Sequence, residues 1–350
     1  MYLAIDIGGT KTLIAAFNHR GKVIKKHRFK TPGNKKTFLA VLEAALIPFS
    51  VRHRSKIEQV IIAIPGIIED NIAVKFGNRP WKNLDLEKQL GHLFDCKITL
   101  ENDANLATVF ETSKRKGLGL YLTFSTGIGG GLARKGQLAK NSGSVEPGHT
   151  TYIFDNKSLE WEDIASCAAI GAVYDRQATS VRGESAYEDI ALRVALGLPE
   201  VIQKYHPDYI VIGGPLAKLF HHFKADLRKD LKNLLPNKSL PRIVPARRPK
   251  ESVIYGCYLF AKARAKKAKK SQKTRAKTNI KSWDDTKKSR QLAAENARKA
   301  AKENARLEKQ KLKEEMKVMK EKAKARAKQA KQAKKASRSQ ASKKESRGRK

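Results

Sequence analysis

The opening of the chain alternates between apolar runs and short polar breaks, a pattern that predicts successive strands. An apolar run over residues 2–7 ends in two glycines, and residues 12–17 and 22–29 read as two further strands. The first glycine loop, residues 8–11, therefore joins strand to strand. Dinucleotide and P-loop motifs place their glycines between a strand and a helix, so neither motif fits here.

The same device recurs in the middle of the chain. Residues 120–124 predict a strand, residues 125–131 form a polar glycine-rich loop, and a returning strand turns at residues 134–136. This repetition indicates two similar lobes that face each other. Glycine turns of this kind present successive backbone N–H groups, which can hold phosphate oxygens.

Helical periodicity and further apolar runs predict the elements around these strands. Helices are expected at about residues 35–49, 103–114, 158–175, 186–205, 216–231 and 252–267. Further strands are expected at residues 59–64, 98–101 and 209–212. The last strand ends in Gly213 and Gly214, and ligands of open α/β sheets collect at such carboxyl ends.

Two aspartates stand where strands end. Asp6 has apolar neighbours, and because an unpaired buried carboxylate is costly, we expect it to face an open cleft or a positive partner. Asp103 stands where a strand ends and a helix begins. Taken alone, an aspartate at such a position is more often a helix N-cap than a catalytic group.

The composition indicates a globular body with a basic tail. A chain of 350 residues is long enough for two domains with separate cores. The whole chain has a net charge of +39, and residues 261–350 hold 35 of its 73 Lys and Arg residues and 9 of its 34 Asp and Glu residues, a net charge of +26. Sustained like charge with few apolar residues is typical of a solvated extension.

Membrane and secretory signals are not found in the sequence. No apolar run reaches the ~18 residues that a membrane span needs, and the chain opens on a strand rather than on a charged segment followed by an apolar one. We therefore expect a cytoplasmic protein without a transmembrane segment. Cys96, Cys167 and Cys257 lie far apart, which argues against a disulfide framework and a cysteine zinc site.

Seven motifs, in order, resemble those of the ROK sugar kinases, with glucokinase-like members. They are DIGGTKT, IPGIIED, GNRPW, ENDANLA, STGIGGG, EPGH and IVIGGP, and the resemblance covers roughly residues 1–260. It implies the α/β fold class, as a two-lobed actin-like ATPase (ribonuclease H-like) fold shared with sugar kinases and heat-shock ATPases. A disordered or helical basic tail would follow. We expect an N-terminal lobe, a C-terminal lobe, a closing helix and the tail at residues 1–115, 116–250, 251–267 and 268–350.

The resemblance implies ATP-dependent phosphorylation of a hexose, of glucose type or an amino sugar, with Mg²⁺. Asp103 falls on the family's catalytic base, and Asp6 on a residue that helps to position magnesium. The residues that would meet the nucleotide are Asp6, Gly8, Gly9, Thr10, Lys11, Thr126, Gly127, Gly129, Gly130, Gly213 and Gly214. The residues that would hold the sugar are Gly66, Asn78, Asn102, Asp103, Glu146, His149 and Glu162.

The chemistry of these side chains suits a polyol. Phosphoryl transfer needs mainly alignment, charge neutralisation and a carboxylate that accepts the departing proton. Taken alone, Asn78 would more often serve a turn, and His149 would more often be a structural histidine. The ordered motifs reverse these odds for both residues, but not for Trp81, which we expect in the core or at a hinge.

One departure from the family concerns zinc. Many relatives carry a C-x-C-G-x-x-G-C segment after the His of E-x-G-H, and those cysteines hold a structural zinc with that histidine. The corresponding segment here, HTTYIFDNKSLEWED, contains no cysteine, so we predict no zinc and no metal-ligating residue set. We expect Tyr152, Ile153 and Phe154 to pack into the small lobe and steady the loop that presents His149. ROK repressors carry a winged DNA-binding domain before the body, which we do not expect here.

The tail leaves two hypotheses open. It is either a solvated mobile extension or an electrostatic attachment to nucleic acid or another polyanion, such as a ribosome or an anionic membrane surface. Its stripe of Leu307, Leu312, Met316 and Met319 is too short for a coiled coil, and Trp283 is its single aromatic residue, so sequence specificity should be poor. The alternative function is a catalytically weak sugar- or nucleotide-binding module that the tail tethers to nucleic acid. A homodimer also stays open.

Overall fold

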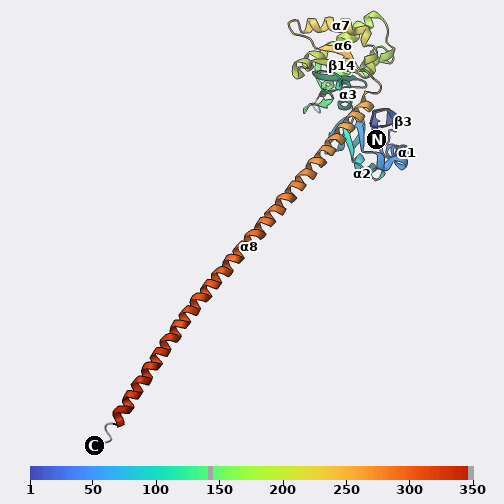
Figure 1. Ribbon diagram of the computed structural model, residues 1–350. Coiled ribbons are helices and arrows are strands. Elements are labelled where there is room, and N and C mark those ends of the chain that lie inside the picture. Colours follow the sequence, from blue (N-terminus) through green and yellow to red (C-terminus); the bar gives the residue numbers. More distant parts are fainter. Residues whose placement is uncertain (141–144, 346–350) are drawn as a thin grey trace. The chain divides into compact units, whose positions relative to one another are not determined.

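The computed structural model (Figure 1) describes residues 1–140 and 145–345. Side chains are described for these residues except at positions 52, 270, 272–286, 312, 315, 318, 323 and 325–345, so Leu312 and Trp283 lie outside the described side chains. The chain divides into two compact units, Met1–Lys269 and Lys270–Lys350. The first unit holds both five-stranded sheets and all the candidate site residues.

The first sheet has the strand order β3-β2-β1-β4-β8. Its strands are β1 (Tyr2–Ile7), β2 (Lys11–Phe17), β3 (Val23–Lys30), β4 (Gln59–Ile64) and β8 (Ile98–Asn102). β1, β2 and β3 are antiparallel neighbours, whereas β1, β4 and β8 run parallel. The carboxyl ends of the three parallel strands therefore meet at one edge, from which Gly8, Gly66 and Asp103 follow.

The second sheet repeats this topology in the order β11-β10-β9-β14-β15. Its strands are β9 (Leu118–Phe124), β10 (Ile128–Arg134), β11 (Gln137–Leu138), β14 (Tyr209–Gly213) and β15 (Arg242–Pro245). The first three are antiparallel, and β9, β14 and β15 are parallel. The two similar lobes that the repeated strand, glycine loop and strand predicted are thus present.

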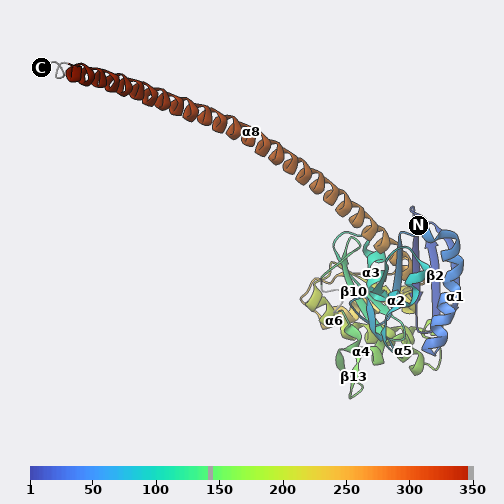
Figure 2. The same cartoon turned by 90° about the horizontal axis from the view of Figure 1, so that it is seen from below.

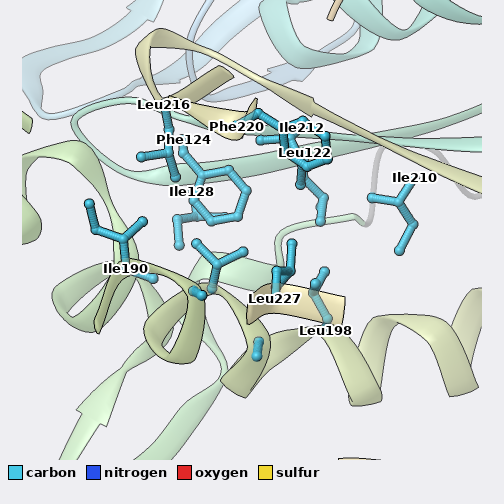
Figure 3. Close-up of a cluster of buried hydrophobic side chains, with 14 of the residues drawn as sticks. Leu122, Phe124, Ile128, Ile190, Leu198, Ile210, Ile212, Leu216, Phe220 and Leu227 are labelled. Carbon is cyan, nitrogen blue, oxygen red and sulfur yellow. The ribbon is translucent and has the colours of Figure 1, made fainter. Parts of the chain in front are cut away.

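Helices cover the outer faces of both sheets. α1 (Lys35–His53) packs Phe38 and Leu42 against Ile5 of the first sheet, and it flanks β2 in Figure 2. α6 (Glu184–Tyr205) and α7 (Phe220–Leu234) cover the second sheet. Figure 3 shows the resulting core, in which Leu198 and Leu227 lie on the helix side and Ile212 on the strand side.

The inner faces share α3 (Asp103–Thr112) and the first turns of α8 (Ser252–Glu345). Leu106 of α3 and Cys257 of α8 pack against Ala4 and Ala63 of the first sheet. Ala107 of α3 lies in a cluster with Tyr121 and other residues of the second sheet. The helix that begins at Asp103 therefore contacts both lobes.

Shorter elements complete the first unit. They are β5 (Ile67–Glu69), β6 (Ile72–Phe76), β7 (Arg79–Leu84), β12 (Thr151–Phe154), β13 (Lys157–Glu160), α2 (Leu86–Leu90), α4 (Trp161–Ala165) and α5 (Cys167–Val173). Single 3₁₀ turns are η1 (Arg54–Lys56), η2 (Gly91–Leu93), η4 (Pro147–His149), η5 (Ala178–Ser180) and η6 (Pro215–Lys218). β5, β6 and β7 form a three-stranded sheet, and β12 pairs with β13.

Two predicted helices differ from the structure. The helix expected over residues 158–175 is wrong, because β13, α4 and α5 occupy that segment. Ser166 is extended there, and its hydroxyl caps α5 by accepting from the Ala169 amide at 3.1 Å. The helix expected to end near residue 267 continues to Glu345, since neither Pro nor Gly occurs between Gly256 and Gly348.

The second unit is helical up to Glu345, and a helix is one of the two states, helical or disordered, predicted for the tail. The described side chains over residues 287–311 are all exposed. Among the residues described, we find no helix with the length and apolarity needed to cross a bilayer.

Candidate active site

The first glycine loop is a tight hairpin with a solvent-exposed tip. The Gly8 amide donates to the Lys11 carbonyl at 3.0 Å, and Thr31 Oγ1 donates to the Gly8 carbonyl at 2.9 Å. The Arg79 guanidinium donates to the Gly9 carbonyl. A Cβ added at Gly9 would meet no atom within 4 Å, so a ligand can approach the backbone at the tip. Thr10, beside Gly9, is exposed as well.

Asp6 lies on β1 between Leu13 of β2 and Ala63 of β4. Burial and the nearby Asp103 carboxylate raise the pKa of Asp6 to about 7, whereas Arg28 acts in the opposite direction. In the protein alone, the positive charge of Arg28 therefore does not offset the burial of this carboxylate and its repulsion by Asp103. Such an oxygen donor suits a hard cation.

Asp103 is the first residue of α3, but it does not cap the helix. The N-cap is Asn102, whose Oδ1 accepts from the amides of Ala104 and Asn105 at 2.9 and 3.2 Å. Asp103 Oδ1 accepts from the Ala104 amide at 2.8 Å. Burial raises the pKa of Asp103 to about 6, with a further contribution from Glu146, although the Ala104 amide opposes this. Because Asn102 fills the capping role, the Asp103 carboxylate is not needed as the N-cap of α3.

Two of the predicted sugar residues, Gly66 and Asn102, contact each other, and a third follows a residue that lies close to Gly66. Asn102 Nδ2 donates to the Gly66 carbonyl at 3.1 Å. Gly66 has φ +108°, and a Cβ there would stand 2.8 Å from the Gly77 nitrogen, so only glycine fits. The exposed Asn78 follows Gly77 in the turn between β6 and β7. The structure thus brings Gly66, Asn78 and Asn102 together.

The second glycine loop contacts a predicted sugar residue directly. The Ile128 amide donates to Glu162 Oε2 at 3.2 Å, and the Ser125 amide closes the loop on the Gly127 carbonyl at 2.9 Å. A Cβ at Gly127 would stand 2.5 Å from Glu162 Oε2, and one at Gly130 would stand 2.6 Å from Val145. These glycines are needed because neighbouring side chains approach the backbone.

The third glycine pair lies beside the second loop. Gly213 at the end of β14 pairs with Thr123 of β9, and Gly129 of β10 pairs with the same residue. Gly214 has a φ of +68°. Thr126 lies exposed at the tip of the second loop. The glycines predicted to meet the adenosine and the phosphates of the nucleotide therefore adjoin in the second lobe.

The remaining predicted residues gather around His149. Its Nδ1 is 2.9 Å from Glu160 Oε2, and this hydrogen bond raises the pKa of His149 while burial opposes it. Burial raises the pKa of Glu146, and Glu162 adds to the effect, whereas His149 and Lys75 counteract it. The Asp103 carboxylate contributes to the raised pKa of Asp6, Glu146 to that of Asp103, and Glu162 to that of Glu146. These carboxylates therefore lie near enough to disfavour one another's ionisation.

Within the part of the chain that the structure describes, one group of three potential metal ligands stands close together. Oxygen and nitrogen atoms of His149, Glu160 and Glu162 lie within 4.8 Å of one another. No cysteine belongs to this group. The prediction that zinc is absent is neither supported nor contradicted by this geometry.

The segment that replaces the cysteines forms the hairpin β12–β13. Tyr152 donates from its hydroxyl to Glu200 Oε2 at 2.8 Å, and the Arg193 guanidinium lies 4.8 Å from the centre of the Phe154 ring. The expectation that Ile153 packs inward is wrong, because its side chain is 73% exposed. Alternation along the strand turns Ile153 away from the face that carries Tyr152 and Phe154.

Sequence reasoning missed three residues that support the site. Arg79 braces the first glycine loop, Thr31 holds Gly8, and Glu160 pairs with His149. Arg79 lies inside the quoted GNRPW motif, beside Asn78, but nothing in that motif shows that it reaches a loop 70 residues away. Trp81 of the same motif is 3% exposed and stacks on Phe38, as expected for a core residue.

A model of the ROK family matches residues 2–264. The chain belongs to the ROK family. This ROK chain is 25% identical over 293 residues to a glucokinase of Halalkalibacterium halodurans, covering 69% of this chain and 87% of that protein. It is 31% identical over 158 residues to an N-acetylmannosamine kinase of Escherichia coli O157:H7, covering 42% and 53% of the two chains.

Solved ROK structures share the fold. A ROK family glucokinase from Streptomyces griseus, in complex with glucose and AMPPNP, aligns with a TM-score of 0.61 and 19% identity, over 73% of this chain and 97% of that one. The two-lobed actin-like ROK fold predicted from the motifs is confirmed. The family match ends at residue 264, before most of the basic tail.

Proposed function

We propose that this chain transfers the terminal phosphoryl group of ATP to a hydroxyl of a hexose, with Asp103 as general base. The carrying observation is the position of Asp103 at the carboxyl end of β8, directly after Asn102, whose side chain donates to the Gly66 carbonyl at 3.1 Å. Asp6 and Glu146 lie near enough to interact with this carboxylate electrostatically. A base at this position would accept the proton of a hydroxyl held by the predicted sugar residues. The names of the related kinases support a hexose of glucose type or an amino sugar.

The residues present fit a magnesium nucleotide. The exposed tip at Gly9 leaves room for phosphate oxygens, whereas at Gly127 and Gly130 the protein's own Glu162 and Val145 side chains lie against the backbone. Asp6 would help to hold Mg²⁺, because burial and the Asp103 carboxylate, which raise the pKa of Asp6, disfavour its negative charge unless a cation is bound. When bound, Mg²⁺ neutralises charge on the phosphates and so favours attack by the hydroxyl.

The protein's own groups supply proton transfer and orientation. With a pKa of about 6, Asp103 is largely ionised at neutral pH and can accept the hydroxyl proton as the new bond to phosphorus forms. Asn78, Glu146 and Glu162 would orient the remaining hydroxyls through donor and acceptor pairs. Asn102 already uses Oδ1 for the cap, which fixes the strand end that presents Asp103.

A coupled ADP-release assay over a panel of hexoses tests the proposal. The panel includes glucose, mannose, fructose, N-acetylglucosamine and N-acetylmannosamine. Asp103→Asn should lower sugar-dependent turnover by about 10²- to 10⁴-fold. Asp163→Asn, at an exposed position one residue after Glu162, is the matched control and should retain it. Sugar-independent ADP release, or an Asp103→Asn variant that turns over as fast as the control, would contradict the assignment.

A second candidate is a catalytically weak sugar- or nucleotide-binding module tethered to nucleic acid. The observation that favours it is the basic second unit, whose described side chains over residues 287–311 all face solvent. Electrostatic attachment of this kind releases counterions, so binding should weaken steeply with salt. We expect the full chain, but not a chain ending at residue 268, to retard DNA and RNA at low salt. Equal retardation by both would exclude the tail, and hexose binding without turnover would favour the module.

A further inference from the structure

One face of α6 packs against the hairpin β12–β13 and α4, which carry part of the proposed sugar site. Arg193, Gly197 and Glu200 follow an i, i+4, i+7 spacing, so they lie on one side of the helix. A Cβ at Gly197 would stand 2.2 Å from the ring of the fully buried Trp161, so glycine leaves the room that this indole needs. This face of α6 is therefore shaped to receive α4.

The side chain of Arg193 is held in one orientation on this face. Its Nε donates to Asp189 Oδ2 at 2.7 Å, one helical turn earlier, and the Tyr174 hydroxyl donates to the same oxygen at 2.9 Å. The Arg193 side chain is only 11% exposed. Because a guanidinium that is largely buried and paired at Nε has little freedom, its other nitrogens and its flat face meet fixed neighbours.

Two of these neighbours lie at the two ends of α4. Arg193 Nη1 donates to the Ile164 carbonyl at 3.2 Å, which is among the last carbonyls of α4 and so needs a partner from outside that helix. The Trp161 indole, at the first residue of α4, donates to the Arg193 carbonyl at 3.0 Å. Glu162 lies between these two contacts. Arg193 therefore fixes the short helix from which Glu162 contacts the second glycine loop.

The same face also holds the hairpin before α4. The Arg193 guanidinium lies 4.8 Å from the centre of the Phe154 ring, so it spans both the hairpin and α4. Glu200 Oε2 accepts from the Tyr152 hydroxyl at 2.8 Å, and its Oε1 accepts from the Thr150 hydroxyl at 3.4 Å. Two charged side chains of α6 thus anchor β12 and the residue before it.

His149 is tied to this assembly by its neighbours. Thr150 directly follows His149, and its carbonyl accepts from the Trp161 amide at 2.8 Å. Glu160, at the end of β13, is hydrogen-bonded to His149 Nδ1 at 2.9 Å. A displacement of the hairpin or of α4 would therefore move His149 as well as the carboxylate that pairs with it.

We propose that Arg193 is a positioning residue of the sugar site, assisted by Glu200, and that α6 thereby sets where Glu162 and His149 meet the hexose. This inference rests on the proposed kinase function. Thr31 and Arg79 hold the first glycine loop, on the other lobe. Loss of the α6 contacts should therefore weaken the interaction with the hexose more than the interaction with ATP.

Steady-state kinetics with ATP and the hexose of the panel that has the highest kcat/KM test the role of Arg193. Arg193→Met removes the guanidinium, and Arg228→Met, at an exposed arginine of α7, is the matched control. We expect Arg193→Met to raise KM for the hexose about tenfold or more and KM for ATP less than about threefold, with both values unchanged in the control. An unchanged KM for the hexose overturns the inference. An equal rise in both KM values would show general packing instead and overturns it too.

A milder pair of variants tests the same face without removing a buried charge. Glu200→Gln and Tyr152→Phe each weaken one hydrogen bond, so each should raise KM for the hexose about threefold, and the double variant should raise it no further. Glu188→Gln, exposed on α6, should leave it unchanged. Unchanged values in both single variants, or fully additive effects in the double variant, overturn the part assigned to Glu200. A wild-type chain that turns over none of the hexoses would instead overturn the proposed kinase and, with it, the positioning role.

Discussion

Arg79 donates a hydrogen bond to the Gly9 carbonyl, and so joins the turn that carries Asn78 to the tip of the first glycine loop. The same guanidinium lies 3.4 Å from the carbonyl oxygens of Thr31 and Pro32. One side chain thus holds both the proposed sugar turn and the proposed phosphate loop. Movement of either segment would therefore displace the Arg79 side chain and disturb its hydrogen bond to Gly9.

Removing Arg79 should loosen the phosphate loop. Hydrogen bonds from a charged donor contribute about 1.5–3 kcal/mol each, so we expect Arg79→Leu to raise KM for ATP about tenfold or more. Steady-state kinetics at saturating hexose measure the effect. Lys82→Leu, an exposed cation on the same strand, is the control and should leave KM unchanged. Equal KM values for the Arg79 variant and the wild type would show that the loop needs no brace.

The pKa of Asp103 sets the acidic limb of the activity profile. Because a general base acts only when ionised, kcat/KM should fall as the pH drops through the raised pKa of about 6. We expect Asp103→Asn to lower kcat by about 10²- to 10⁴-fold across the whole profile. Rates measured from about pH 5 to 8 test this. An activity that stays flat down to about pH 4.5 would contradict a base with a raised pKa.

Asp6 should reduce the stability of the ligand-free protein. The pKa of Asp6 is about 7 in the folded protein, which is above its value in the unfolded chain. The protein is therefore more stable near pH 4, where the carboxyl group is protonated, and it loses this stability as the pH rises from about 4 to 7. Asp6→Asn should therefore stabilise the protein above pH 7, on the order of 1 kcal/mol after solvent screening, and change little near pH 4. Urea unfolding at both pH values measures the difference. A variant less stable than the wild type at about pH 8 would refute the sign.

Substitution of the buried Glu111 of α3 should lower the free energy of unfolding strongly. Its fully buried carboxylate contacts Arg115 at 3.1 Å and the Arg247 side chain at 3.3 Å, besides the backbone amides before α8. Removing one partner of such a buried set costs about 3–5 kcal/mol, so we expect Glu111→Gln to lower the free energy of unfolding by several kcal/mol. Glu188→Gln, exposed on α6, should change it by less than about 0.5 kcal/mol. Similar values for the two variants would mean that the network contributes little.

Zinc should be absent from the purified protein. His149, Glu160 and Glu162 offer no thiolate, and the hydrogen bond to Glu160 raises the pKa of His149, so a metal ion would compete with a proton for this imidazole. Elemental analysis after purification without chelators should give far less than one zinc per chain. Stoichiometric zinc that is lost in Glu160→Gln would show that the ion pair is in fact a metal site.

Local patterns predicted most of the fold. Strands β1 and β4, both glycine loops and the repeat of one lobe by the other followed from apolar runs and turn residues, because these signals depend on neighbours within a few positions. The break at Ser166 was missed, since an extended serine that caps the next helix differs from a helical one only through contacts outside the segment. The tail was predicted to be either disordered or helical, and the absence of Pro and Gly favours the continuous helix that extends beyond residue 267.

The order of residue types along the chain was enough to find the groups with suitable chemistry, namely the glycines, Asp6, Asp103 and the carboxylates after residue 145. The tertiary packing, in contrast, brings Arg79 to the Gly9 carbonyl and the Arg247 amide to Glu111. The residues of each pair lie far apart along the chain. Hydrogen bonds, desolvation and Coulomb interactions act through space, and these partners become neighbours only when the sheets and α3 pack together.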